Sequence, residues 1–348
     1  MLGKQNKDNT PLFFVSQSYI TVANAGSKPS SDFEAVLRRL NFKGIGLHSI
    51  YIRNGYHWWV RNWLSVQLAK IIMPKKGIAV FQYPEQRQLA SLLDRAQKRG
   101  NRIIMLIHDI NELRGFPNNH PDWLRSADVV IAHSPAMQLW LKDNYNVDNT
   151  INLGVFDYLT YELPNKEKTY GKPSVIFAGR LDKSDFIPKM CISNPKVDFV
   201  LFGPGFPETL RNKTNVCYKG VCPPDELPSL ISQYNFGLVW DGNSIDGCEG
   251  ATGNYVKYNS PYKISSYLAA GIPVIVWNKM AVAQFVNDNK IGLVVSSLSE
   301  LTESLSSVTN DEYQMLCNNV SKVRTKLTTG GYYEAAIKKA LRIIYKNE

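Results

Sequence analysis

A lysine near the start of an expected helix is the residue best placed to bind an anion. Pro261 suits the first turn of a helix, and Lys263 follows two positions later. A cation there opposes the helix macrodipole, so the arrangement is favourable only when an anion lies between them. A diphosphate is such an anion, whereas the alternative is a solvated lysine at a helix end. Gly271 would end this helix, and the apolar run 272–277 follows it as a buried strand.

Two more basic residues follow the apolar run 174–178. Arg180 offers paired N–H donors that suit phosphate oxygens, and Lys183 adds a compact positive charge. We expect both residues to lie where a strand ends, which is where parallel sheets bind ligands. The alternative is that Arg180 is a surface arginine at a strand end.

Carboxylates follow two other apolar runs. His108 and Asp109 come after the run 103–107, and Asp241 comes after the run 236–240. A carboxylate at such a place could act as a general base for a hydroxyl nucleophile, and His108 could hydrogen-bond a hydroxyl. The alternative for Asp109 is that it caps the following turn by accepting backbone N–H groups.

A small polar loop precedes the first expected helix and contains Asn24, Gly26, Ser27 and Lys28. We expect the helix to begin near Ser31, with a capping box to the glutamate three residues later. Gly26 would permit close approach of a ligand, although an ordinary turn is the alternative. The loop is neither a GxGxxG nor a Walker motif, so neither a nicotinamide cofactor nor ATP is indicated.

Continuous apolar runs alternate with helical patterns along the whole chain, which is typical of buried parallel strands. We expect strands at 12–15, 78–81, 103–107, 129–132, 174–178, 198–202, 236–240, 273–277 and 291–295. Helices are expected at 87–99, 135–144 and 332–345. The alternation predicts an α/β protein with two doubly wound domains and a ligand cleft between them. The expected boundaries are 1–160, 161–330 and a C-terminal helix at 331–348 that packs back on the first domain, with a linker at 161–173.

Composition narrows the classes of partner. The 348 residues carry a formal charge of +10, and residues 1–160 hold 19 Lys and Arg against 12 Asp and Glu. No nucleic-acid-binding signature accompanies this charge, so we do not expect nucleic acid as a partner. Five cysteines without a CxxC pair indicate neither a disulfide framework nor a zinc site. The segment 56–74 is too polar to span a bilayer but could lie on one; the alternative is a half-buried amphipathic helix.

The second half of the chain resembles the nucleotide-sugar site of GT-B glycosyltransferases through its pattern PxK…YLAAGxPVIVW. The chain as a whole is similar to the bacterial glucosyltransferase-3-like family, related to β-1,6-galactofuranosyltransferases. The segments that carry this resemblance are NAGSKPSSDFEAVL (24–37), LIHDINELRG (106–115), ADVVIAHSPAMQLWL (127–141), LGVFDYL (153–159), FAGRLDKSDF (177–186) and FGLVWDG (236–242).

The resemblance implies a role for each candidate. Lys263 and Arg180 would contact the donor diphosphate, and Asp109 with His108 would serve catalysis. The remaining donor-site candidates are Lys183, Gly203 near the nucleobase, Asp241, Tyr255, Asn259 and Ser265. The loop from Asn24 to Lys28 would face the cleft across from the donor, and 242–259 would be a mobile loop that orders when donor binds. One departure is that the Glu-x7-Glu pair of many retaining relatives would fall on Tyr258 and Ser266, so the stereochemistry stays open.

The expected reaction moves a hexose from a UDP-sugar to a hydroxyl of a glycan acceptor on a glycoprotein or lipid-linked precursor. Glucose, N-acetylglucosamine and galactofuranose all remain candidate sugars. We expect no metal and no cofactor beyond the UDP-sugar, and a cytoplasmic protein that can contact the inner face of the plasma membrane and form homo-oligomers. Two alternatives are a UDP-sugar epimerase and a non-catalytic nucleotide-sugar-binding subunit.

Overall fold

The computed structural model describes residues 10–16, 26–46, 56–84, 89–116, 120–160 and 170–346, without the side chains of 56–59, 61, 62 and 89. The chain divides into two compact units. Unit 1 comprises Met1–Asn111, Asn118–Leu153 and Tyr333–Glu348, and unit 2 comprises Glu112–Pro117 and Gly154–Tyr332. The main change of unit therefore falls at Leu153–Gly154, a few residues before the boundary expected at 160.

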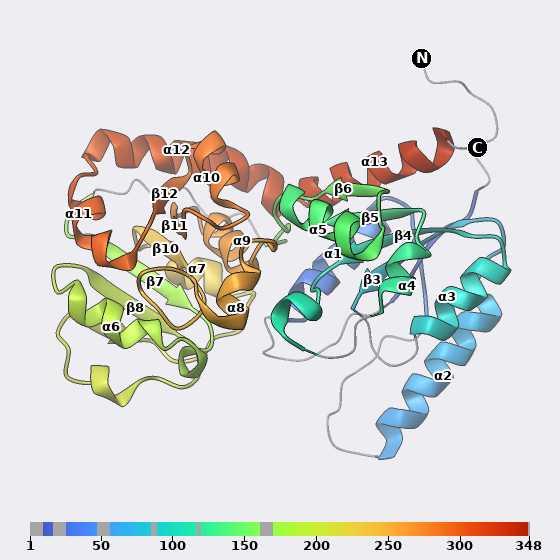
Figure 1. The fold of residues 1–348 in the computed structure, drawn as a ribbon, viewed down its shortest axis with the longest axis horizontal. Coiled ribbons are helices and arrows are strands. Elements are labelled where there is room, and N and C mark those ends of the chain that lie inside the picture. The colour runs from blue at the N-terminus through green and yellow to red at the C-terminus, as the bar shows by residue number, and fades with distance from the viewer. Residues whose placement is uncertain are drawn as a thin grey trace. The chain divides into compact units, whose positions relative to one another are not determined.

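Unit 1 is a parallel sheet with helices on both faces (Figure 1). Its strand order is β2-β1-β3-β4-β5-β6. The strands are β1 (Leu12–Val15), β2 (Lys43–Ile45), β3 (Ile78–Tyr83), β4 (Arg102–Ile107), β5 (Val129–Ala132) and β6 (Thr150–Asn152). The helices are α1 (Lys28–Arg39), α2 (Tyr56–Ile72), α3 (Leu89–Lys98), α4 (Pro121–Arg125), α5 (Pro135–Tyr145) and α13 (Gly331–Lys346), whose part from Tyr333 belongs to this unit.

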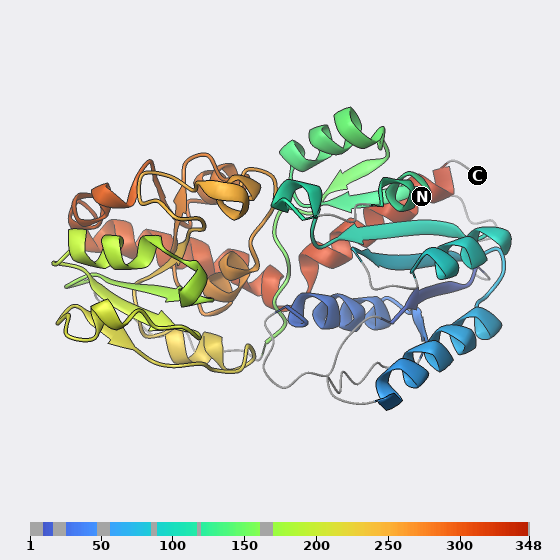
Figure 2. The same cartoon turned by 60° about the horizontal axis from the view of Figure 1, so that its bottom comes forward.

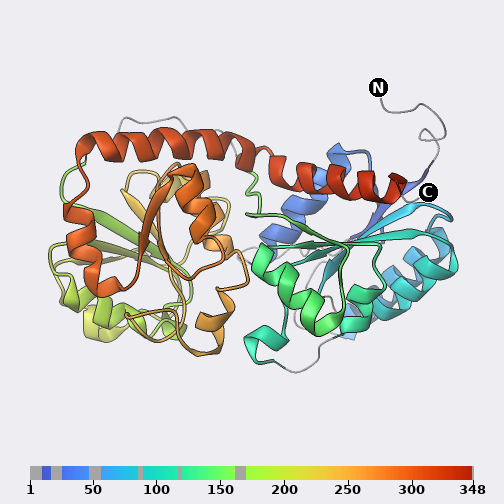
Figure 3. The same ribbon diagram turned by 45° about the horizontal axis from the view of Figure 1, so that its top comes forward.

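Unit 2 repeats the same kind of architecture with the order β12-β11-β10-β7-β8-β9, again all parallel. Its strands are β7 (Ser174–Ala178), β8 (Asp198–Phe202), β9 (Val216–Tyr218), β10 (Phe236–Val239), β11 (Val274–Trp277) and β12 (Gly292–Val295). Its α-helices are α6 (Phe186–Ser193), α7 (Leu227–Ile231), α8 (Gly250–Tyr255), α9 (Tyr262–Ala269), α10 (Ala283–Asn289), α11 (Leu301–Ser306) and α12 (Asn310–Thr328). Short 3-10 helices are η1 (Glu112–Arg114), η2 (Leu181–Lys183), η3 (Glu208–Leu210) and η4 (Leu298–Glu300). The long helix α12 packs on α9 and α10 (Figure 3).

Both strand orders contain a switch point, where successive crossovers run to opposite sides of the sheet. In unit 2 this point lies between β7 and β10, which pair through Phe236 opposite Val175 and Gly237 opposite Ile176. In unit 1 it lies between β1 and β3. Ligands of open parallel sheets bind beyond the carboxyl ends of the strands at such points. The topology alone therefore selects the loops after β7 and β10 in unit 2, and after β1 and β3 in unit 1.

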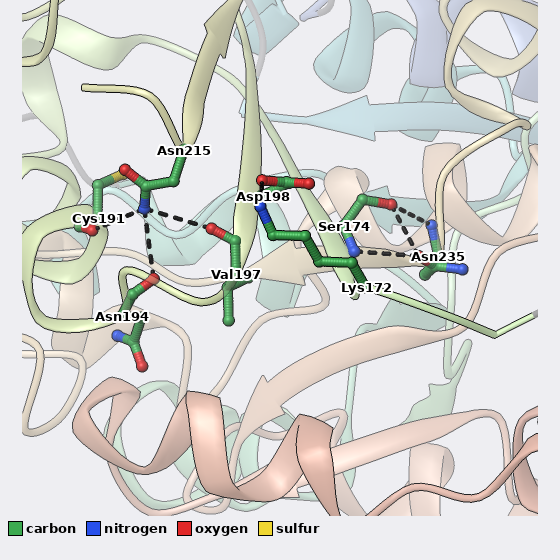
Figure 4. Close-up of polar contacts among 8 residues, drawn as sticks. All are labelled: Lys172, Ser174, Cys191, Asn194, Val197, Asp198, Asn215 and Asn235. Carbon is green, nitrogen blue, oxygen red and sulfur yellow. Dashed lines mark hydrogen bonds and ion pairs between the residues drawn. The ribbon is translucent and has the colours of Figure 1, made fainter. Parts of the chain in front are cut away.

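The amino ends of the unit 2 strands carry a set of asparagines whose contacts are structural (Figure 4). The Asn215 amide donates to the carbonyls of Cys191, Asn194 and Val197 at 3.0, 3.3 and 3.3 Å. At the start of β7, Asn235 accepts from the backbone N–H of Ser174 at 3.0 Å. Because these polar groups are satisfied within the fold, they stabilise strand ends opposite the edge that the switch point selects.

One local expectation needs correction. Helix α1 begins at Lys28 with Ser27 as its N-cap, so it does not begin near Ser31 and has no side-chain cap. Pro29 explains the early start, because proline suits the first turn.

The segment 242–259 contains α8, and Trp240 donates from its indole to the Ser244 carbonyl at 2.9 Å. Its ordering on donor binding stays a prediction.

Within the described part of the chain, no helix is long and apolar enough to cross a membrane.

Candidate functional site

Helix α9 carries Lys263 in its first turn, with Pro261 as the N-cap. Three contacts fix the helix. The Ser265 hydroxyl donates to the Phe156 carbonyl at 2.7 Å, and the Ala178 N–H at the end of β7 donates to the Tyr267 hydroxyl at 2.9 Å. A Cβ at Gly237 would lie 2.2 Å from the Tyr267 ring, so only glycine on β10 lets that ring pack there. The sequence thus pins α9 against both switch-point strands.

The Lys263 ammonium is held at the carboxyl end of β7. Its Nζ lies 4.5 Å from the centre of the Phe177 ring, a cation–π contact. Burial lowers the pKa of this ammonium, and the nearby groups of Asp241 and Cys248 oppose that shift. Because its surroundings compensate its charge only partly, this lysine is poised to attract an anion.

The loop after β7 makes room for this lysine and presents two more cations. A Cβ at Gly179 would lie 2.9 Å from Lys263 Cε and 3.3 Å from Nζ. Arg180 and Lys183 are exposed, and the Arg180 guanidinium is bound bidentately by Asp182, with one Nε–Oδ1 distance of 3.0 Å. This pairing raises the pKa of Arg180 and lowers that of Asp182. An exposed ion pair is weak, so Arg180 can exchange Asp182 for another anion.

Gly203 lies in the turn after β8, and its lack of a side chain has a structural cause. Its φ is +127°, and a Cβ there would lie 1.8 Å from the Gly179 carbonyl oxygen. Gly205, with φ +80°, packs equally closely on Asp182. The turn therefore braces the loop after β7. Gly203 is part of the same strand edge as Lys263, but its glycine identity is explained by packing.

Asp241 follows β10 and starts a compact segment. Its Oδ1 accepts the N–H of Gly242 at 2.8 Å, and Cys248 is buried beside it. Burial raises the pKa of the Cys248 thiol to about 12, so it is a neutral thiol near Lys263. The segment after Asp241 is therefore a folded wall of the lysine environment.

The remaining donor-site candidates differ in access. Ser265 is fully buried and donates to the Phe156 carbonyl, and Tyr255 is 4% exposed; their roles in donor binding stay predictions. Asn259 is different, because its side-chain Oδ1 is buried without a hydrogen-bond partner. A buried acceptor without a partner is unusual in a native fold. Its place just before α9 suits a site where a bound ligand supplies the missing hydrogen-bond donor.

In unit 1, His108 follows β4 and joins a buried polar cluster with Gln82 at the end of β3. His108 Nε2 lies 2.6 Å from Gln82 Oε1 and 3.4 Å from the Ser30 hydroxyl. Burial and then His133 lower the pKa of His108 to about 3, so the ring is neutral near pH 7. The Gln82 Nε2 group is buried without a partner. A neutral imidazole that donates to Gln82 positions groups better than it takes up protons.

Asp109 lies next to His108 and is partly buried at the carboxyl end of β4. Gly26 and Ser27 form the turn before α1. Lys28 is largely buried and bridges to Asp32 at 3.2 Å. Asn24 lies outside the described residues. The structure thus groups His108, Ser30 and the start of α1, and separately groups Lys263, Arg180 and Asp241.

Several groups at these sites escape motif-based reasoning. Phe177, Asp182, Cys248 and Gln82 each become relevant through a contact with a candidate residue. For Phe177 and Gln82, the sequence offers one signal, namely that each lies near the end of an apolar run. For Asp182 and Cys248 it offers none. Among the described residues, no group of three or more His, Cys, Asp or Glu side chains could hold a metal ion.

Two doubly wound parallel-sheet units, each with polar groups at its switch-point edge, define the GT-B fold. Solved structures share this fold: WaaG, a glycosyltransferase involved in lipopolysaccharide biosynthesis, has a TM-score of 0.52 at 12% identity, covering 95% of this chain and 99% of that one. Staphylococcus aureus TarM, solved with UDP, has a TM-score of 0.54 at 14% identity, over 81% and 59% of the two chains.

The chain belongs to the glucosyltransferase 3-like family. Residues 13–155 match its N-terminal domain and residues 175–340 its C-terminal domain. The chain is 33% identical to the β-1,6-galactofuranosyltransferase WbbI of Escherichia coli K12, over 80% of this chain and 83% of that one. It is 29% identical to glucosyltransferase 3 of Streptococcus gordonii, over 66% and 67%. The protein is therefore a glycosyltransferase, which disfavours the epimerase and the non-catalytic subunit.

Proposed function

We propose that the protein transfers a hexose from a UDP-sugar to a hydroxyl of a glycan acceptor. The observation that carries the proposal is the position of the Lys263 ammonium. It lies beside Phe177 at the switch point of unit 2, and the nearby groups of Asp241 and Cys248 compensate its buried positive charge only partly. The amino end of α9 adds backbone N–H groups to the same place, and these also favour an anion. A sugar diphosphate matches both features.

In the proposed reaction the bond between the anomeric carbon and the diphosphate oxygen breaks, and UDP leaves with an additional negative charge. Lys263 stabilises that developing charge, and Arg180 adds bidentate donors once it exchanges Asp182 for phosphate. The acceptor oxygen forms the new glycosidic bond and gives up its proton. Asp109 remains the candidate base for that proton, and neutral His108 is a candidate partner for a sugar hydroxyl.

The relatives bound the choice of sugar. Their names specify a galactofuranosyltransferase and two glucosyltransferases, so galactofuranose and glucose are the first donors to test. N-acetylglucosamine follows, because TarM was solved in complex with α-GlcNAc-glycerol and UDP. We further propose a cytoplasmic enzyme that acts on a protein-linked or lipid-linked glycan.

The test is a panel of UDP-sugars assayed for binding and transfer with Lys263→Ala. We expect kcat/KM to fall at least about 100-fold, because removing a group that stabilises transition-state charge costs about 3 kcal/mol. Binding of UDP should weaken as well. Lys213→Ala is the matched control, because Lys213 is an exposed lysine of the same unit near the far edge of the sheet.

Unchanged transfer and UDP affinity in Lys263→Ala would remove this lysine from the mechanism. Isomerised donor in a reaction without acceptor would instead identify an epimerase. Equal losses in Lys213→Ala would show that the effect is not specific to the switch-point lysine.

A further inference from the structure

Helix α2 of unit 1 presents large apolar side chains to solvent. Trp63, Leu64, Leu68, Ile71 and Ile72 are 46%, 47%, 38%, 70% and 46% exposed. Leu64, Leu68, Ile71 and Ile72 stand at the i, i+4, i+7 and i+8 positions of the helix, so they line one face. Five exposed large apolar residues on one helix form a continuous patch, which marks an interaction surface. We call these five residues the outer face of α2.

The opposite face of α2 attaches the helix to the fold. Ala69 on this face is 1% exposed, a Cβ at Gly46 would lie 3.3 Å from the Ser65 hydroxyl, and Met73 directly after the helix is buried as well. An ordinary surface helix turns its larger apolar residues inward. On α2 the small residues Ser65 and Ala69 face the unit, whereas the large apolar residues of the outer face are exposed to solvent.

The carboxyl end of α2 is held firmly. Arg95 on α3 donates from Nε to the Lys70 carbonyl at 3.3 Å, and Arg99 donates to the Met73 carbonyl. Helices α2 and α3 lie side by side in both views (Figures 1 and 2). Because α3 caps the last turn of α2, the outer face is presented on a rigid element.

The sequence around α2 carries basic residues and no carboxylates. The fifty residues 35–84 contain no Asp or Glu and eight basic residues, namely Arg38, Arg39, Lys43, Arg53, Arg61, Lys70, Lys75 and Lys76. Lys75 and Lys76 are exposed directly after α2 and are close in sequence to Ile71 and Ile72. Apolar side chains beside unopposed lysines are the combination that binds an interface rich in anionic lipid.

We propose that the outer face of α2, with Lys75 and Lys76, docks the protein onto an anionic lipid bilayer. The apolar residues enter the boundary between head groups and acyl chains, and the lysines contact lipid phosphates. A second copy of the chain is the less suitable occupant. In a two-fold interface the same surface meets itself, which would bring lysines together without a carboxylate in residues 35–84 to pair with them.

The experiment is co-sedimentation of the full chain with vesicles of phosphatidylglycerol and phosphatidylcholine, compared with phosphatidylcholine alone. The variant Leu64→Ser/Ile71→Ser should weaken binding to the anionic vesicles at least about tenfold, because two side chains lose their apolar contact. Leu139→Ser is the control, because Leu139 is a leucine of α5 in the same unit with 60% exposure. Lys75→Gln/Lys76→Gln should weaken binding about 10- to 30-fold, since each lysine near an anionic surface contributes about fivefold.

Circular dichroism and thermal melting would show that the variants remain folded, and sedimentation velocity without lipid would report their oligomeric state. Absence of anionic-vesicle binding by the wild-type chain would overturn the proposal. So would equal losses in the Leu139→Ser control. A change of oligomeric state in Leu64→Ser/Ile71→Ser, with lipid binding unaltered, would assign the outer face to a second copy. Lipid binding needs no donor, so these outcomes are independent of the proposed chemistry.

Discussion

At the scale of the residue, the position of the Lys263 ammonium depends on an empty space at Gly179. The flexible end of the lysine fills the volume that a side chain at Gly179 would occupy. The backbone φ of Gly179 is not in the left-handed region, so the glycine serves space and not conformation. A methyl group there would meet the tip of a flexible side chain and not backbone.

Gly179→Ala should therefore displace the Lys263 ammonium while the fold persists. We expect KM for the UDP-sugar to rise about tenfold, which corresponds to losing roughly one charge-assisted contact of ~1.4 kcal/mol. The melting temperature should change little, because an alanine in a compatible backbone costs less than about 1 kcal/mol. Steady-state kinetics and thermal melting of the same preparation measure both effects.

Gly171→Ala is the matched control, because a Cβ at Gly171 meets no atom within 4 Å. Its kinetics should match those of the wild type. If Gly179→Ala retained a normal KM, the ammonium would not need its present position. If both variants lost activity, the effect would be one of general backbone rigidity.

Sequence alone could predict that Lys263 lies in the first turn of a helix, because the signal is local: a proline, a lysine and a glycine that ends the helix lie within eleven residues. The companions of Lys263 could not be found this way. Phe177 lies 86 positions earlier and reaches the ammonium only through the pairing of strands. Asp182 belongs to no motif, yet its carboxylate accepts hydrogen bonds from the Arg180 guanidinium. Contacts between distant segments carry no local pattern.

At the scale of the element, strand burial decides what sequence reveals. All nine apolar runs form strands; eight of these are central parallel strands, which are buried on both faces, and the ninth, β12, lies at the edge of its sheet. The strands that escaped are β2, β6 and β9, each three residues long and each at the edge of a sheet. Edge strands are partly exposed and need no apolar run; β2 is Lys-Gly-Ile, for example.

Two buried histidines, His108 after β4 and His133 after β5, determine how the stability of unit 1 depends on pH. His133 follows β5, is 1% exposed and lies with Nε2 2.8 Å from the Ile107 carbonyl oxygen. Burial lowers the pKa of His133 to about 4, and that of His108 to about 3, from an unfolded value of 6.5. Below pH 6.5 the unfolded chain takes up protons that the folded unit does not. Stability is therefore fully present above pH 6.5 and is lost as the pH falls toward 4.

We expect each histidine to contribute a fall of up to about 1.4 kcal/mol per pH unit in that window. Removing one of them, in His133→Asn, should make the fall shallower, whatever the variant does to stability at neutral pH. Urea unfolding at several pH values, followed by tryptophan fluorescence, measures the slope. The exposed His120→Asn variant is the control and should keep the wild-type slope. A slope unaltered by His133→Asn would show that this histidine is not buried in its neutral form.

At the scale of the whole molecule, the chain leaves unit 1 after Leu153 and returns to it with α13. Tyr333 on α13 packs its ring 4.9 Å from that of Phe33 on α1, and its hydroxyl donates to the Pro29 carbonyl at 3.2 Å. Ile337 and Ile344 are also buried. The part of α13 from Tyr333 onward thus completes the core of the first unit.

Truncation after Tyr332 should consequently unfold unit 1 and spare unit 2. Burying the side chains of Tyr333, Ile337 and Ile344 stabilises the unit by roughly 5–9 kcal/mol, at about 1.5–3 kcal/mol each. That amount is comparable with the entire stability of a typical domain, which is about 5–15 kcal/mol.

The two units carry separate spectroscopic and chemical probes for this prediction. All five cysteines lie in unit 2, where Cys191 and Cys248 are buried, and five of the seven tryptophans lie in unit 1. In the truncated chain we expect the part of the cooperative fluorescence change that comes from the five tryptophans of unit 1 to disappear, leaving the smaller transition of Trp240 and Trp277 in unit 2, while the buried thiols keep their slow reaction with Ellman's reagent. A synthetic peptide of residues 333–348 should restore the fluorescence transition, because it supplies the missing core residues. A wild-type fluorescence transition in the truncated chain would mean that α13 merely covers a unit that is stable without it, and fast thiol reaction would mean that unit 2 depends on it too.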